Sequence, residues 1–281
     1  MEGFTNLKEV RVTTPFGKPS DPIILGNVQG LRVAFLARHG RGHHILPSGI
    51  NYRANIHALK SLGVTRVFSV SAVGSMKETI RPGDFVLPDQ FIDRTTQRDN
   101  TFFDQGIVAH VTFADPICGT LSTVLEKASH GASVQVHRPG TYLCIEGPQF
   151  SSRAESFLYR QWGVDVIGMT NIPEAKLARE AELCYSTLAL VTDYDCWHET
   201  ENAVSVGAIL SIMQKNVETA KVVLRYALEL AKDLGTCSCH TALEHAVITP
   251  LKQISPVLRK RYQLLLRRHL LSTTLHSKKR A

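Results

Sequence analysis

An apolar run that ends in two acidic residues constrains this chain more than any other feature. Residues 186–191 read Ser-Thr-Leu-Ala-Leu-Val, a run without helical period, so we predict a buried strand there. Asp193 and Asp195 follow directly. Because alternate residues of an extended chain point the same way, both carboxylates are expected to reach into one pocket. The alternative is a strand-to-loop turn with two solvated acids.

The remaining pattern alternates strands with helices, which is typical of a three-layer α/β domain. We expect strands at 31–37, 67–72, 83–95 with a break at Pro88, and 164–168, and helices at 51–62, 116–128, 152–162, 173–182 and 203–234. Ser151 or Ser152 is the expected N-cap of the third helix, with Glu155 completing a capping box. We place one domain at 1–250 and a basic extension, helical or partly disordered, at 251–281.

Composition narrows the class of protein. The chain has 281 residues, 43% hydrophobic composition and a net charge of +7, with much of the excess in 259–261, 267–268 and 278–280. Such a tail can contact anionic surfaces, but a solvated terminus is the more economical interpretation, and no aromatic residues accompany the charges as in nucleic-acid binders. No signal peptide or membrane-spanning run is evident. Scattered cysteines fit a reducing compartment, so we expect a cytoplasmic protein without nucleic-acid or membrane partners.

Residues 38–44, Arg-His-Gly-Arg-Gly-His-His, follow the first of these strands. Two arginines and three histidines around two glycines favour an anion site, since the arginine fork matches phosphate. The competing interpretation is a metal site at His39, His43 and His44, but no nearby acid or cysteine supports it.

A second possible metal motif is Cys237-Ser-Cys239-His240. Two thiols and one histidine leave a tetrahedral shell incomplete. A disulfide between cysteines this close would be strained and easily reduced. We therefore expect free thiols and no metal or cofactor.

Five blocks resemble the trimeric purine nucleoside phosphorylase family, and most closely its branch that acts on methylthioadenosine. They are residues 36–40, 83–96, 146–155, 168–170 and 192–197, and the resemblance extends over roughly 10–250. It implies a phosphorylase-type α/β fold with a central mixed sheet flanked by helices, and a homotrimer. It also implies cleavage of S-methyl-5′-thioadenosine by inorganic phosphate to adenine and 5-methylthioribose 1-phosphate.

This reaction needs an acid above the purine and an anionic nucleophile below the sugar. The resemblance makes Asp193 the acid at purine N7 and lets Asp195 support recognition of the 6-amino group. Relatives that act on 6-oxopurines typically carry Asn at the position of Asp193, so we favour a 6-aminopurine. The alternatives are a preference for methylthioinosine, inosine, guanosine or adenosine, and a catalytically impaired relative.

The resemblance assigns the remaining site by position. Phosphate would be held by Arg38, His39, Ser71, Ala72 and Thr170. The base and ribose would be bordered by Phe150, Ser151 and Met169. The methylthio group would lie against Val206, Ile209 and Leu210, and His110 would come from a neighbouring subunit.

One departure concerns the N-terminus. Family members begin with an apolar strand and a Gly-Gly-(Thr/Ser)-Gly loop that binds phosphate, whereas this chain reads Met1-Glu-Gly-Phe. We expect the sheet to lose a strand and expose an edge. The favoured explanation is a start that lies upstream, and the alternative is the impaired relative.

Overall fold

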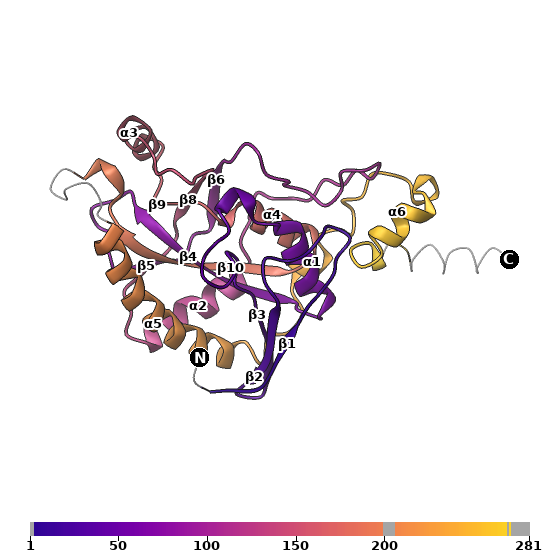
Figure 1. The fold of residues 1–281 in the computed structure, drawn as a ribbon, viewed down its shortest axis with the longest axis horizontal. Coiled ribbons are helices and arrows are strands. Elements are labelled where there is room, and N and C mark those ends of the chain that lie inside the picture. Colours follow the sequence, from indigo (N-terminus) through magenta and orange to yellow (C-terminus); the bar gives the residue numbers. More distant parts are fainter. Residues whose placement is uncertain (1–2, 199–205, 269, 271–281) are drawn as a thin grey trace.

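A seven-stranded mixed sheet forms the centre of the computed structural model, which describes residues 3–198, 206–268 and 270 (Figure 1). Its strand order is β6-β8-β9-β4-β10-β5-β7. These strands are β4 (Arg66–Ser75), β5 (Phe85–Val86), β6 (Gln90–Arg94), β7 (Val136–His137), β8 (Thr141–Ile145), β9 (Val166–Gly168) and β10 (Cys184–Asp193). The predicted α/β class with a central mixed sheet is confirmed.

Helices cover both faces of this sheet (Figure 1). α2 (Gly119–Gly131) and α5 (Val206–Leu230) pack together against β10, while α1 (Tyr52–Ser61) and α4 (Asn171–Glu180) pack together on the other face. The shorter helices are α3 (Arg153–Gln161), α6 (Pro256–Arg261), η1 (Pro47–Gly49), η2 (Asp195–Trp197), η3 (Ser238–Thr241) and η4 (Leu251–Gln253). Three layers result, as the alternating pattern predicts.

β10 lies between β4 and β5 in the sheet and is buried along nine of its ten residues. It runs parallel to β4, with Cys184 opposite Arg66 and Val191 opposite Val73. Parallel strands end at the same edge of a sheet, so the end of β4 and the end of β10 meet there. That edge is where a ligand is expected.

A separate antiparallel ribbon comes first in the chain, formed by β1 (Phe4–Val10), β2 (Ile23–Val28) and β3 (Leu31–Phe35). On the side away from β10, β4 pairs only with β9, at Gly74 and Ser75. Within the described residues, most of that edge of β4 therefore has no neighbouring strand.

Two local details differ from the sequence-based expectations, and a third agrees with them. The segment around Pro88 forms two strands, β5 and β6, which lie on opposite sides of β10 and β4 in the sheet. α2 begins three residues later than predicted, because Cys118 is held in an extended conformation as its N–H donates to Tyr185 O at 2.9 Å. The third predicted helix has Ser152 as its N-cap and the predicted capping box with Glu155.

The segment after residue 250 packs onto the domain. Ile254, Tyr262, Leu265 and Leu266 belong to the same buried cluster as the α4 side chains. Within the described residues, no helix is both long and apolar enough to cross a bilayer.

Candidate active site

Asp193 ends β10 and lies beside Gly74 of β4. Its Oδ2 accepts the Thr192 hydroxyl at 2.7 Å, and its Oδ1 accepts the Asp195 N–H at 2.9 Å. A Cβ on residue 74 would lie 2.9 Å from Asp193 Oδ1. Glycine at 74 therefore makes room for the carboxylate at the strand end.

Asp195 reaches the site by a route that the sequence argument missed. The chain leaves the extended conformation after Asp193 and Asp195 has φ +54°, at the start of η2. Strand alternation therefore does not align the two acids, and the turn brings them together instead. The turn is fixed because Trp197 Nε1 donates to Ser75 O at 2.7 Å and Ser156 Oγ donates to Asp195 Oδ2 at 2.5 Å.

The alternative of two solvated acids is excluded by the burial of this turn. Asp195 is 8% exposed. Burial raises the pKa of Asp193, although the Thr192 hydroxyl and the Asp195 N–H oppose the shift. Burial also raises the pKa of Asp195, against the hydrogen bond from Ser156. A carboxyl whose pKa is raised retains its proton closer to neutral pH, which suits Asp193 to general-acid chemistry.

A second polar cluster lies further back along β4, around Ser71. Ser71 Oγ is 3.2 Å from Thr170 Oγ1, and Thr170 Oγ1 accepts Arg38 Nη1 at 3.5 Å. Ala72, next along β4, is exposed. The structure thus brings Arg38, Ser71 and Thr170 together, as predicted for an anion site.

Glu174 holds Arg38 in this cluster, and it is a residue that the sequence analysis missed. Arg38 Nε and Nη2 donate to the Glu174 carboxylate at 2.6 and 2.9 Å. Burial disfavours ionisation of Glu174, but the Arg38 charge and hydrogen bonds from Arg38, Tyr185 and Ser69 outweigh it and lower its pKa. The longest contacts of the guanidinium are those of Nη1, to Val70 O at 3.2 Å and to Thr170. Nη1 is therefore the part of Arg38 best able to turn to a bound anion.

His39 lies in the loop that follows. Its Nδ1 is 2.9 Å from Ile45 O, and its ring stacks on His43 at 4.3 Å. Burial lowers the pKa of His39. A neutral His39 with Nδ1–H donating to Ile45 O has a lone pair at Nε2; once protonated, Nε2 becomes a donor for an anion.

Arg98 holds the loop that carries Phe150 and Ser151. Its side chain is 1% exposed and pairs with Glu146 Oε1 at 2.8 Å. It also donates to Glu146 O at 2.6 Å and to Met169 O at 2.7 Å. The sequence places Arg98 in a predicted loop and does not show that it is buried or what it binds, because its partners lie about 50 and 70 residues away.

The loop side chains themselves are unequally placed. Phe150 is 68% exposed. The Ser151 hydroxyl is buried and has no hydrogen-bond partner among the described residues. Met169 Sδ lies so close to Gly147 that a Cβ there would be 2.6 Å away, so Met169 packs against this loop.

For four predicted contact residues, the described structure gives no contact with these strand ends. His110 is exposed, and its N–H donates to Ala246 O at 2.8 Å. Leu210 on α5 is 52% exposed. The side chains of Val206 and Ile209 lie outside the described residues.

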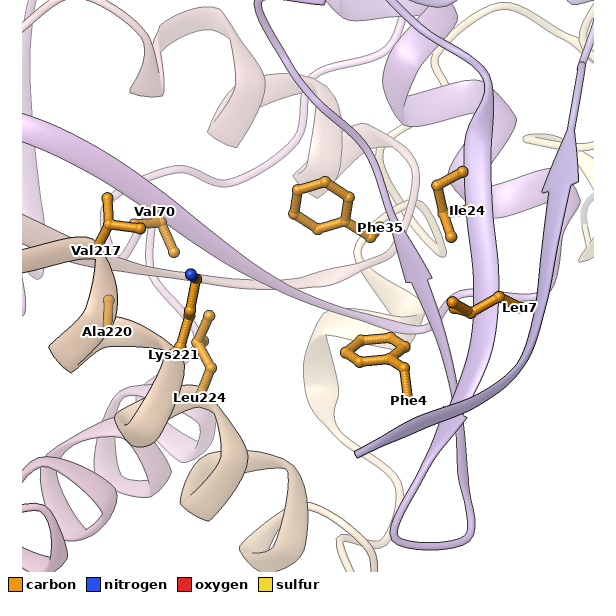
Figure 2. Close-up of a pocket in the computed structure, with 9 residues that line it drawn as sticks. All are labelled: Phe4, Leu7, Ile24, Phe35, Val70, Val217, Ala220, Lys221 and Leu224. Carbon is orange, nitrogen blue, oxygen red and sulfur yellow. The ribbon is translucent and has the colours of Figure 1, made fainter. Parts of the chain in front are cut away.

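An apolar cavity of about 380 Å³ separates the N-terminal ribbon from α5 (Figure 2). Phe4, Leu7 and Phe35 of the ribbon face Val217 and Leu224 of α5 across it. Its other lining residues are Ile24, Val70, Ala220 and Lys221. The cavity offers apolar surface and one lysine, so the acid chemistry lies at the strand ends and not here.

Comparison with known proteins identifies the class. The Phosphorylase superfamily model matches residues 2–229. The chain belongs to this superfamily, so the family resemblance is confirmed.

Similar proteins are named for one activity. The S-methyl-5'-thioadenosine phosphorylase of Koribacter versatilis is 56% identical over 266 residues, covering 95% of this chain and 91% of the relative. The protein of that name from Geobacter sulfurreducens is 55% identical, covering 95% and 93%. A crystal structure of methylthioadenosine phosphorylase from an antarctic soil metagenomic library is 51% identical with a TM-score of 0.92, covering 95% of this chain and 94% of that one. The Schistosoma mansoni enzyme in complex with adenine is 36% identical with a TM-score of 0.85, covering 88% and 95%.

Proposed function

We propose that the chain is a pentosyltransferase that cleaves S-methyl-5′-thioadenosine with inorganic phosphate, yielding adenine and 5-methylthioribose 1-phosphate. The observation that carries the proposal is the pairing of a half-buried acid at the end of β10, Asp193, with the anion cluster further back along β4, around Ser71. Ser71 and Gly74 are three residues apart on β4, or roughly 10 Å. That span leaves room for a purine and a ribose between Asp193 and the Arg38 cluster.

The reaction places negative charge on the purine and positive charge on the sugar. Asp193 lies at the purine end of the site, and the phosphate cluster around Arg38 lies at the sugar end. Breaking the N-glycosidic bond places negative charge on the purine, and Asp193 donates a proton to purine N7. Asp193 is held for this by Thr192 and the Asp195 N–H. A positioned acid contributes about 10²- to 10⁴-fold in rate.

Asp195 supports recognition of the 6-amino group. An ionised carboxylate only accepts hydrogen bonds, which matches an amine and disfavours a 6-oxo group. Ser156 fixes Asp195 Oδ2. Phe150, Ser151 and Met169 border the base and ribose, and Val206, Ile209 and Leu210 accommodate the methylthio group.

Phosphate binds at the opposite end. Arg38 donates through Nη1 while Glu174 retains Nε and Nη2, and Ser71, Thr170, the Ala72 backbone and His39 complete the site. The contribution of this end of the site is electrostatic. The Arg38 guanidinium positions the phosphate oxygens below the sugar C1′, where positive charge develops. No metal or other cofactor is needed for this chemistry, because phosphate itself is the nucleophile.

The assembly is proposed to be a homotrimer in the cytoplasm, with His110 reaching the site of a neighbouring subunit. Phe157 and Leu158 of α3 and its C-cap residue Trp162 are each more than 40% accessible, which supports burial of this helix against another copy. Light scattering on the purified protein measures the number of chains.

Substrate ranking tests the proposal. The specificity constant is measured for methylthioadenosine, methylthioinosine, adenosine and inosine at saturating phosphate. We expect methylthioadenosine to lead. A higher value for inosine or methylthioinosine contradicts the role given to Asp193 and Asp195.

A further inference from the structure

Four cysteines from distant parts of the sequence meet at the end of β10 opposite to Asp193. Cys118 is the N-cap of α2, Cys184 begins β10, and Cys237 and Cys239 lie in the segment after α5. Their four Sγ atoms lie within 4.8 Å of one another. Cys118, Cys184 and Cys239 are buried and Cys237 is half-buried.

We propose that this cluster binds one Zn²⁺ ion as a structural tetrathiolate site. A tetrahedral zinc ion lies about 2.3 Å from each sulfur, so its ligand sulfurs are about 3.8 Å apart. The Cys118 and Cys237 sulfurs are already 3.7 Å apart. The sequence motif alone supplied two of these thiols, Cys237 and Cys239, and the fold completes the set with Cys118 and Cys184.

The sulfur spacing favours a mononuclear metal site over a covalent bond between two sulfurs. A disulfide has sulfurs about 2.05 Å apart, and all six cysteines are free in this structure. An iron–sulfur cluster places inorganic sulfide and more than one iron between its thiolates, which requires a wider arrangement than one in which all four sulfurs lie within 4.8 Å. A single tetrahedral ion is the occupant that matches this size.

The surroundings suit bound thiolates. His240 Nδ1 accepts the Cys237 N–H at 3.4 Å, which places the ring proton on Nε2, and Nε2 lies 3.4 Å from Cys184 Sγ. That N–H is therefore directed at a ligand sulfur, an outer contact typical of metal sites.

Apolar side chains close the site. Phe68, Leu121 and Leu234 pack around the cysteines. Four protein ligands leave no open position for a substrate or water, which is the mark of a structural zinc site. Cys184 and Asp193 are also nine residues apart on one strand, or ~30 Å, so the ion takes no part in the reaction. It would tie α2, β10 and the segment after α5 into one unit.

Metal content tests the proposal directly. Untagged protein, purified with reductant from zinc-supplemented cells, is expected to hold about one zinc per chain by mass spectrometry of the metals. Replacement by Co²⁺ is expected to give the sulfur-to-cobalt charge-transfer band of a thiolate site. Cys184→Ser and Cys239→Ser are each expected to lose the tightly bound metal, whereas Cys144→Ser, which changes a buried cysteine outside the cluster, is expected to retain it.

Wild-type protein provides a second measurement that does not depend on the variants folding. Removal of the metal with a chelator, in the presence of a reductant that keeps the thiols free, is expected to lower the melting temperature, and added Zn²⁺ to restore it. Absence of zinc and of the cobalt band in fully reduced protein overturns the proposal. Retention of the metal in folded Cys239→Ser, or disulfides among these four cysteines in the protein as it exists in cells, overturns it as well.

Discussion

Glu174 holds the Arg38 guanidinium through two charge-assisted hydrogen bonds, of 2.6 Å to Nε and 2.9 Å to Nη2. The pair is nearly buried, with side-chain exposures of 14% and 8%. Neither residue is near its partner in the sequence, and α4 delivers the glutamate to the loop that follows β3. Glu174 is thus a positioning residue for the proposed phosphate site, and Ser156 has the same relation to Asp195 at the base end.

Glu174→Gln is expected to weaken phosphate binding. Loss of one charged hydrogen bond costs about 1.5–3 kcal/mol, so KM for phosphate rises roughly 10- to 100-fold while KM for methylthioadenosine changes little. Steady-state kinetics with phosphate as the varied substrate measures this. Glu180→Gln is the matched control, because Glu180 is buried on the same helix but binds Thr101 and Phe102. Equal effects of the two substitutions on KM for phosphate would show that Glu174 acts only through stability.

Ser156→Ala is expected to produce the opposite pattern. Asp195 loses the 2.5 Å hydrogen bond that orients it, so KM for methylthioadenosine rises about tenfold and KM for phosphate is nearly unchanged. The control on the same helix is Ser152→Ala, which removes the N-cap and costs about 1 kcal/mol of stability without touching Asp195. A larger rise in KM for methylthioadenosine in the control than in Ser156→Ala argues against the assignment of Asp195.

Asp193→Asn is expected to lower kcat by about 10²- to 10⁴-fold, since the amide cannot protonate purine N7. Wild-type kcat is also expected to fall as pH rises through the pKa of Asp193, which burial raises. A nitrophenyl 5-methylthioriboside needs no proton on its leaving group, because nitrophenolate is a stable anion. Rapid cleavage of that substrate by Asp193→Asn supports the acid role, and an equal loss on both substrates contradicts it.

The same substitution is expected to stabilise the fold at neutral pH. The folded-state pKa of Asp193 is raised, so the protonated side chain contributes favourably to the free energy of unfolding. This contribution is complete below about pH 4, the ordinary pKa range of aspartate, and it is lost as pH rises through the folded-state pKa. Asparagine has no charge to bury. Melting curves should therefore show Asp193→Asn above wild type at pH 7, with the gap closing in acid. A difference in melting temperature between Asp193→Asn and wild type that widens in acid would contradict a raised folded-state pKa of Asp193.

Arg98→Met is expected to destabilise the fold by about 3–5 kcal/mol. It removes one partner of a nearly buried ion pair and leaves the Glu146 and Met169 carbonyls without their donor. Chemical unfolding of Arg98→Met and Arg138→Met gives the comparison. Arg138 pairs with Glu126 at the surface, where such pairs contribute about 0–1 kcal/mol. Similar losses in both variants would contradict the role of Arg98.

Local sequence patterns predicted the elements and the position of Asp193. An apolar run without helical period marks β10, and the acid at its end follows from the meeting of parallel strand ends. The Ser152 capping box was readable because its partners lie three residues apart. In contrast, Glu174 and Arg98 act on residues far away in the sequence, and no local pattern shows such contacts. The prediction that strand alternation aligns Asp195 with Asp193 was wrong, because Asp195 itself adopts a left-handed backbone conformation, which ends the extended strand.

The cysteines illustrate the same limit. Cys237 and Cys239 form a readable motif, but Cys118 and Cys184 become neighbours of it only because α2 starts late and β10 begins beside it. Sequence spacing gave half of the cluster, and the fold supplied the other half.

The measurement closest to the central claim is the ratio of sugar product to adenine, with and without phosphate. Purified protein is given methylthioadenosine, and adenine, 5-methylthioribose 1-phosphate and free 5-methylthioribose are quantified. The account predicts one 5-methylthioribose 1-phosphate for each adenine, and no release without phosphate. Adenine release that is independent of phosphate, with free 5-methylthioribose as the sugar product, would contradict it.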